Sequence, residues 1–109
     1  MTTSSYIKTL VFSSDQNLSN PGYVPFARGA SVLVLHMPLP EGATSGTQLH
    51  AVPSRIGQFA ADANPGSVLL SHFMGRSLRE LDRNVREVKA GYGGEIVLAE
   101  DLLCRALTD

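Results

Sequence analysis

Residues 66–98, GSVLLSHFMGRSLRELDRNVREVKAGYGGEIVL, decide the fold because they combine a strand pattern, a helix pattern and a second strand pattern in one continuous stretch. An apolar run ends at Gly75, and apolar residues then recur every three or four positions, which places them on one face of a helix. These inward residues are Leu78, Leu81, Val85 and Val88. The stretch therefore predicts a dominant helix over 78–90, packed on one face of a sheet.

Both ends of the predicted helix carry residues that are typical of helix termini. Ser77 and Glu80 have the spacing of a capping box, in which each side chain bonds the backbone N–H of the other residue. Gly91 is suited to the left-handed conformation that ends many helices. The chain then enters an apolar segment at residues 95–99, so we predict one strand–helix–strand unit.

The remaining apolar segments predict the other strands of the sheet. The strand patterns cover residues 6–12, 31–37, 67–74 and 95–99. Residues 48–61 fit either two short strands broken at Pro53, or a strand and one helical turn. Four apolar residues near the end of the chain fit a short terminal helix: Leu102, Leu103, Ala106 and Leu107.

Together these patterns predict a single α+β domain over residues 1–109, with a mostly antiparallel sheet of about four or five strands. The helix over 78–90 packs on one face of this sheet. The alternative is a ferredoxin-like dimer, in which the sheets of two chains form one barrel or sandwich.

The composition excludes several classes of protein. Nine basic and ten acidic residues give a net charge of −1, so the chain lacks the electrostatic footprint of a nucleic-acid or membrane-surface binder. No apolar run has the length of a membrane span, and the N-terminus lacks the pattern of a signal peptide. A single cysteine allows no intrachain disulfide, which fits a reducing compartment. We expect a cytoplasmic protein that binds neither nucleic acid nor membrane.

The first 75 residues carry few charges and many of the aromatic side chains. Only six of the nineteen charged residues lie there. Four of the seven aromatic residues lie within the first 26 positions: Tyr6, Phe12, Tyr23 and Phe26. Charge depletion with aromatic enrichment is typical of an interface core, so we expect a homo-oligomer or contact with a heterologous protein subunit. The alternative is that the first strand buries these side chains in its own sheet.

Three histidines are the candidate catalytic residues, because imidazole can act as a general acid or base near neutral pH. They are His36, His50 and His72. His36 and His72 lie in strand patterns and can meet if those strands are neighbours, and His72 is the first to test because it lies near a strand end. No two of the three are closer than fourteen positions, unlike the paired ligands of short zinc motifs, so spacing argues against a metal site.

Other chemical motifs are missing from the sequence. There is no G-x-S-x-G elbow, and the leucines around Cys104 favour a buried, inert thiol. The run from Gly91 to Gly94 follows a helix instead of preceding one, so it predicts a turn and not a phosphate loop. The sequence predicts no cofactor.

The apolar strand that ends at Gly75, followed by Ser77, Glu80 and the helix through Val85, resembles the C-terminal lobe of ATP-grasp enzymes. Within that family, the resemblance is to biotin carboxylases and amino-acid ligases. The resemblance implies a detached lobe or subunit, because the nucleotide loop, the phosphate-binding lysines and the magnesium ligands of that family have no counterpart here. It assigns no catalytic residue.

Two functions from different classes fit these observations. The first is a non-catalytic binding or assembly module that completes a larger complex, as the missing motifs and the charge-poor half indicate. The second is a small dimeric enzyme with a ferredoxin-like fold and a pocket lined by His36, His50 or His72. A stoichiometric partner in a pull-down favours the module, and a homodimer with a closed pocket favours the enzyme.

Overall fold

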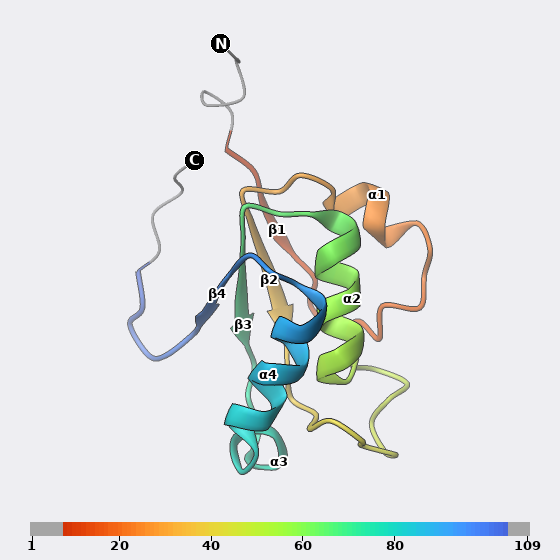
Figure 1. The fold of residues 1–109 in the computed structure, drawn as a ribbon, viewed down its shortest axis with the longest axis vertical. Helices are drawn as coiled ribbons and strands as arrows, with labels where there is room; N and C mark the ends of the chain where they lie inside the picture. The colour runs from red at the N-terminus through yellow and green to blue at the C-terminus, as the bar shows by residue number, and fades with distance from the viewer. Residues whose placement is uncertain (1–7, 105–109) are drawn as a thin grey trace.

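The computed structural model describes residues 8–104, which form one parallel sheet with helices between its strands (Figure 1). The strands are β1 (Leu10–Phe12), β2 (Val32–His36), β3 (Ser67–Ser71) and β4 (Glu95–Leu98). The helices are α1 (Tyr23–Ala27), α2 (Pro53–Ala63), α3 (Gly75–Leu78) and α4 (Leu81–Gly91). The sheet order is β1-β2-β3-β4, and each of these neighbouring pairs is parallel.

The predicted antiparallel sheet is wrong, and the connections explain why. A helix that follows a strand carries the chain back along the sheet, so the next strand starts at the same end and runs parallel to the first. Helices occupy the connections, with α1 between β1 and β2, α2 between β2 and β3, and α4 between β3 and β4. The ferredoxin-like alternative fails for the same reason. The predicted strand positions are confirmed for β2, β3 and β4, with shorter bounds at their ends.

Helix α2 replaces both predicted alternatives for residues 48–61. Pro53 begins the helix instead of breaking a strand, because its fixed φ suits the first helical turn and that position needs no N–H donor. The buried residues recur at helical spacing and include Ile56, Phe59, Ala60 and Ala63. Asn64 ends the helix in a left-handed conformation and donates its N–H to the Ala60 carbonyl.

In place of the single helix predicted over 78–90, the structure has two helices, α3 and α4, separated by a break at Arg79 and Glu80. The Ser77 hydroxyl bonds the backbone N–H and carbonyl of Met74, so the predicted capping box with Glu80 does not form. Leu78 is about half exposed, whereas Val88 is fully buried. Gly91 is the last residue of α4 and has no positive φ.

Gly91 and Gly57 instead allow α2 and α4 to pack closely. A Cβ atom on Gly57 would lie 2.5 Å from the Val88 carbonyl oxygen, and one on Gly91 would lie 2.9 Å from the Gly57 carbonyl carbon. Real Cβ atoms do not approach backbone this closely. The two glycines therefore fix the distance between the helices that cover the sheet.

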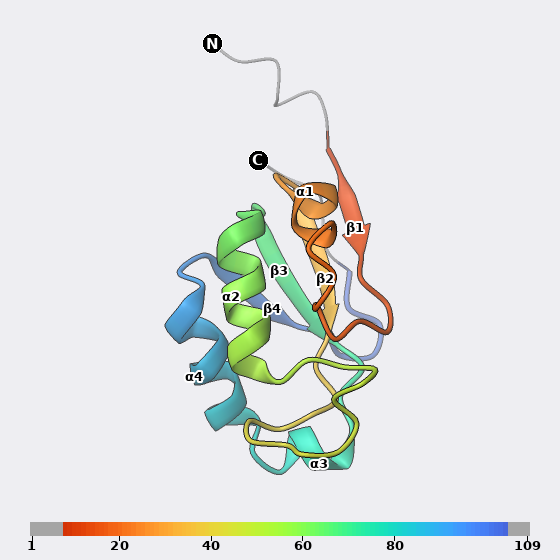
Figure 2. The ribbon, with the colours of Figure 1, turned by 90° about the vertical axis from the view of Figure 1, so that its right-hand side faces the viewer.

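The covering helices lie on one face of the sheet, as Figure 2 shows for α1, α2 and α4. The cause is the strand order. Parallel crossovers are right-handed, and because β1 to β4 are in chain order, every crossover places its helix on the same side. Val11, Leu33 and Val68 share one register position and join the core beneath these helices.

The opposite face of the sheet carries an apolar row that no described helix covers. Side chains alternate along a strand, so the residues next to the core row point away from the helices. One such row runs across the four strands: Phe12, Val34, Leu69 and Val97. We call this row the open face. Phe12 is 62% exposed, Leu69 and Val97 are half-buried, and Val34 is buried.

The end of the described chain differs from its prediction. Residues 101–104 form a turn and an irregular segment, and the remainder of the predicted terminal helix lies outside the described residues. Cys104 is exposed, so the expected burial of its thiol is wrong. No helix in the part of the chain that the structure describes has the length and apolar character to cross a lipid bilayer.

Candidate functional site

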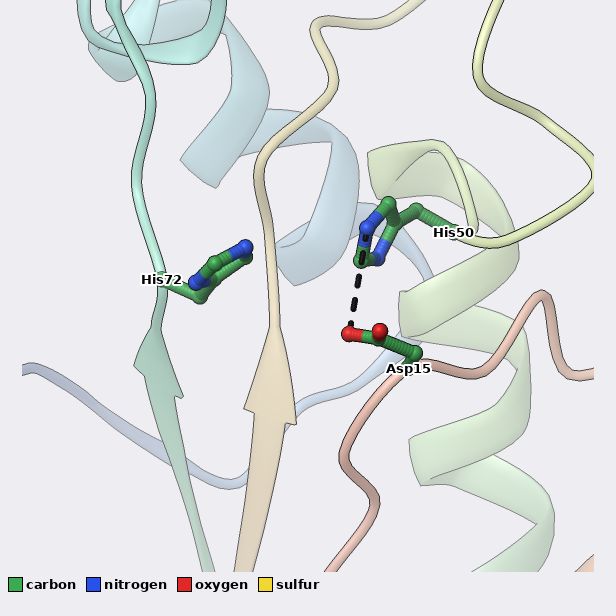
Figure 3. Close-up of side chains that lie close together, drawn as sticks. All are labelled: Asp15, His50 and His72. Atoms are coloured by element: carbon green, nitrogen blue, oxygen red, sulfur yellow. Dashed lines mark ion pairs between the residues drawn. The ribbon is translucent and has the colours of Figure 1, made fainter.

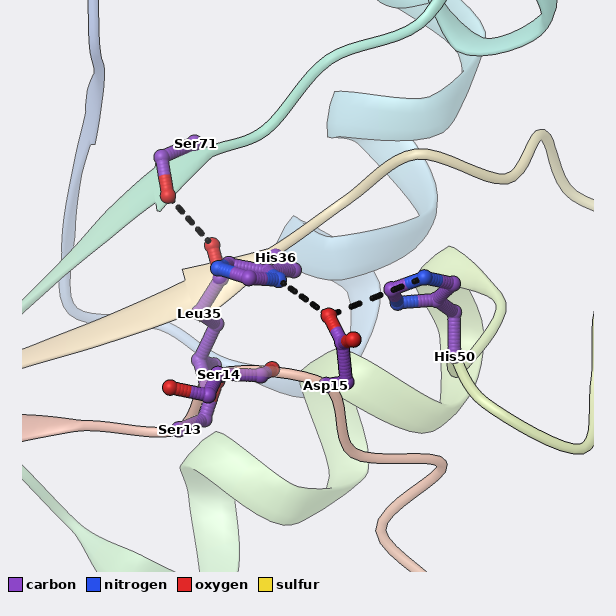
Figure 4. A network of polar contacts seen from close by, with 7 residues as sticks. All are labelled: Ser13, Ser14, Asp15, Leu35, His36, His50 and Ser71. Atoms are coloured by element: carbon purple, nitrogen blue, oxygen red, sulfur yellow. Dashed lines mark hydrogen bonds and ion pairs between the residues drawn. The ribbon is translucent and has the colours of Figure 1, made fainter.

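The candidate site lies at the edge of the sheet where the parallel strands end. Asp15 follows β1, His36 is the last residue of β2, and His72 follows β3. His50 comes from the loop that leads into α2. Because the carboxyl ends of parallel strands share one edge, residues far apart in the sequence meet there. Figure 3 shows Asp15, His50 and His72 close together, and Figure 4 shows His36 beside Asp15 and His50. We call them the edge cluster.

Three members of the edge cluster have the geometry of a partial metal site. Asp15, His50 and His72 each offer one ligand atom, and these atoms all lie within 4.8 Å of one another (Figure 3). The His50 Nε2 atom lies 3.9 Å from the Asp15 Oδ1 atom. Two imidazoles and one carboxylate form a common ligand set for catalytic zinc.

The fourth member, His36, contacts two of the other three. Its Nδ1 atom lies 3.3 Å from Asp15 Oδ1 (Figure 4), and its ring stacks on the His72 ring with centroids 4.5 Å apart and planes 28° apart. The centroid of the His50 ring is farther from that of His36, at 6.1 Å. His36 therefore lies between a carboxylate and an imidazole that belong to the metal-site geometry.

The electrostatic environment favours neutral imidazole at His36. Burial lowers the pKa of His36 most, the neighbouring His72 lowers it further, and the Asp15 carboxylate opposes both effects. The Nδ1 atoms of His36 and His50 are both buried; that of His36 faces the Asp15 carboxylate at 3.3 Å, whereas that of His50 makes no hydrogen bond within residues 8–104. Buried polar nitrogens without a partner are uncommon, and a bound ion or ligand is one explanation for them.

The backbone is strained on either side of the edge cluster. His72 has a φ of 57° and Ser14, directly before Asp15, has a φ of 54°. Residues other than glycine rarely adopt this left-handed region, and such outliers concentrate at functional sites. Both positions lie just after a strand end, beside or within the cluster.

Hydrogen bonds tie the loops that carry the cluster to one another. The Asn17 side chain donates to the Gln48 carbonyl, which links the Asp15 loop to the His50 loop. The Arg55 guanidinium of α2 donates to the Leu18 carbonyl in the same Asp15 loop. These bonds connect the loops on the two sides of the cluster and the helix that follows one of them.

The structure brings together all three histidines that the sequence indicates, and it adds Asp15. Sequence spacing argues against a metal site, but that argument applies to ligands within one motif, and here each donor comes from a separate loop. Sequence reasoning misses Asp15 because a single aspartate in a polar loop carries no pattern. Its position three residues after a strand of a parallel sheet is the signal that identifies it.

The comparisons with known proteins support the fold of this chain. No protein-family model and no curated protein matches the sequence. The structure is similar to the crystal structure of the metallo-beta-lactamase fold protein YhfI from Bacillus subtilis, with a TM-score of 0.74 and 22% sequence identity. The match covers 85% of this chain and 37% of YhfI, so the chain spans little more than a third of that protein.

This similarity overturns the resemblance to ATP-grasp lobes. The strand and helix that suggest ATP-grasp are β3 and α4 of a parallel sheet that matches part of a metallo-beta-lactamase fold. A strand followed by a helix occurs in many folds, so that pattern cannot distinguish them.

Proposed function

We propose that this chain is a metal-binding lobe, which holds a divalent transition metal ion through Asp15, His50 and His72 and forms its complete site together with a second protein layer. The observation that carries the proposal is the convergence of three ligand atoms within 4.8 Å of one another. The name of the structural neighbour, a metallo-beta-lactamase fold protein, supports the same chemistry.

The three donor atoms lie within 4.8 Å of one another and must draw closer to hold a small tetrahedral ion. Zinc–ligand bonds of about 2.1 Å place tetrahedral ligand atoms about 3.4 Å apart. The His50 and Asp15 donors lie 3.9 Å apart in the structure. The side chain of Asp15 is 62% exposed, so it has room to close the remaining distance by rotating.

The residues of the chain have distinct roles in this site. Neutral imidazoles of His50 and His72 would supply nitrogen ligands, and the Asp15 carboxylate would supply an oxygen ligand and offset the positive charge. Zinc held by these three residues would lower the pKa of a bound water to about 7 and so supply a nucleophile for hydrolysis. The proposed class of activity is thus metal-assisted hydrolysis.

The open face supports the second half of the proposal, that another layer of protein completes the lobe. Parallel sheets occur almost only with both faces covered. Here the described helices cover one face, and the partial metal site lies at the edge of the same sheet. The structural neighbour has additional chain beyond the matched 37%. The proposed occupant of the open face is an apolar β-sheet that adds ligands at its own edge.

Cobalt binding tests the metal site. Tetrahedral Co²⁺ absorbs visible light, so titration of the full chain with Co²⁺ reports both affinity and geometry. The Asp15→Ala and His50→Ala variants should each bind Co²⁺ at least about tenfold more weakly than the wild-type chain. Asp82→Ala removes an exposed aspartate on α4 and should change nothing. A wild-type chain that binds no Co²⁺, or equal losses in Asp15→Ala and Asp82→Ala, would contradict the proposal.

Self-association tests the open face. In a solution of the isolated chain, the only apolar sheet surface among the described residues that can cover the open face is the open face of a second copy. We expect light scattering to show a dimer that Phe12→Ser abolishes. Phe26 is 70% exposed on α1, on the helix-covered side, so Phe26→Ser is the matched control and should leave the dimer intact. A monomer at every concentration, or equal effects of the two variants, would exclude this use of the open face.

A further inference from the structure

His36 lies beside the proposed metal site without belonging to its ligand set. The group of donor atoms that lie within 4.8 Å of one another contains Asp15, His50 and His72 but not His36. His36 is the last residue of β2, and it pairs in register with Ser71 of β3. Its backbone thus belongs to a regular strand in the middle of the sheet.

The two ligands that His36 contacts lie outside the regular strands, whereas His36 itself belongs to β2. Asp15 lies in an exposed loop directly after Ser14, whose φ is positive, and His72 has a positive φ of its own. In each case the chain leaves the strand end through a backbone conformation that residues other than glycine rarely adopt. A fixed neighbour that touches both side chains would limit the orientations open to them.

We infer that His36 is a positioning residue for this site, which holds the Asp15 carboxylate through its Nδ1 atom and the His72 ring by stacking. The inference rests on the proposed metal site. Its support is the 3.3 Å distance from His36 Nδ1 to Asp15 Oδ1 together with the 4.5 Å stack on His72. Side chains that orient metal ligands commonly contribute a factor of about 10 to 100 in metal affinity.

Substitutions can separate the contribution of the His36 nitrogen from the contribution of its ring. His36→Phe keeps an aromatic ring against His72 and removes the nitrogen that faces Asp15. His36→Asn removes the ring and retains a polar N–H group near the position of Nδ1. Because the contact with Asp15 involves a charged carboxylate, whereas the contact with His72 is a ring stack, we expect the contact with Asp15 to account for most of the affinity.

Co²⁺ titration of the full chain tests this role with two readouts, affinity and visible spectrum. We expect His36→Phe to weaken Co²⁺ binding about tenfold and to alter the absorption bands, and His36→Asn to stay within about threefold of wild type. Thermal unfolding without metal shows whether each variant is folded. If His36→Phe does not fold, the affinity of His36→Asn still tests the inference.

A double-mutant cycle identifies the partner through which His36 acts. If His36 acts through the carboxylate, His36→Phe combined with Asp15→Ala should bind Co²⁺ no more weakly than Asp15→Ala alone. Additive losses would overturn the inference. So would a His36→Phe variant with wild-type affinity, or one whose spectrum shows the loss of a nitrogen ligand, because His36 would then be a ligand itself. A wild-type chain without Co²⁺ binding would instead overturn the proposed metal site.

Discussion

Two regions of the molecule differ in how they are packed. One is the layer formed by α2 and α4, and the other is the edge cluster of Asp15, His36, His50 and His72. In the layer, Phe59 and Val88 are almost completely buried, and two glycines let the backbones touch. At the edge, a carboxylate is mostly exposed, a buried nitrogen of His50 makes no hydrogen bond within the described chain, and the backbone is strained. Stability is therefore expected to depend on the layer, and ligand binding on the edge. Substitutions in each region test that division.

The largest expected effect is a cavity in the layer. Phe59 of α2 is 1% exposed and makes an edge-to-face contact with Tyr23. Phe59→Ala should lower the free energy of unfolding by about 3 to 5 kcal/mol, measured by urea denaturation. Phe26→Ala, at an exposed aromatic residue, should change it by less than about 1 kcal/mol. Similar losses in both variants would contradict the assignment of the core.

A smaller loss is expected from the contact between the two helices. The added methyl of Gly57→Ala would meet the Val88 carbonyl oxygen at 2.5 Å, so the helices must move apart. We expect a loss of about 1 to 3 kcal/mol in unfolding free energy. A methyl added at Gly93 would have no described heavy atom within 4 Å, and Gly93 has no positive φ, so Gly93→Ala is the control. A Gly57→Ala variant as stable as Gly93→Ala would show that the helices are not in close contact.

The smallest expected effect in the layer depends on pH. Tyr92, after α4, is buried and donates a hydrogen bond to the Pro65 carbonyl. Burial, and to a lesser degree the Glu95 carboxylate, raises the pKa of Tyr92 above its ordinary value of 10.0. The unfolded chain therefore loses this proton first. The stability that Tyr92 contributes is fully present below about pH 10 and is lost as pH rises through the folded pKa.

Alkaline denaturation measures that dependence. Wild-type chain should lose more unfolding free energy than Tyr92→Phe between about pH 9 and pH 11, because phenylalanine has no proton to release. At neutral pH, Tyr92→Phe should be slightly less stable because the hydrogen bond to Pro65 is missing. Identical slopes for the two proteins would show that Tyr92 is not buried as described.

The same division explains which parts of the fold can be predicted from sequence. The apolar runs of β2 and β3 identify those strands, because a run of four or more apolar residues between turn signals is a local pattern. Helix α2 escapes prediction because Pro53 is interpreted as a break, although proline is also favoured in the first helical turn. Without α2, nothing in the sequence requires β2 and β3 to be parallel.

The edge cluster is predictable only in part, since its members meet through topology. The chemistry of imidazole indicates His36, His50 and His72, but no comparable signal indicates Asp15. Each donor follows a different strand or precedes a different helix, so no spacing in the sequence records their contact. The parallel strand order is the information that the sequence pattern lacks.

Zinc-dependent stability tests the central claim, that the edge cluster binds metal independently of the packed layer. A ligand that binds only the folded chain, at about one hundred times its Kd, should raise the unfolding free energy by about 2.7 kcal/mol. With Zn²⁺ at that level, we expect this gain in wild type and an equal gain in Gly57→Ala, whose edge cluster is intact. Asp15→Ala, which we expect to bind at least about tenfold more weakly, should gain no more than about 1.4 kcal/mol. Equal gains in wild type and Asp15→Ala, or no gain in wild type, would contradict the account.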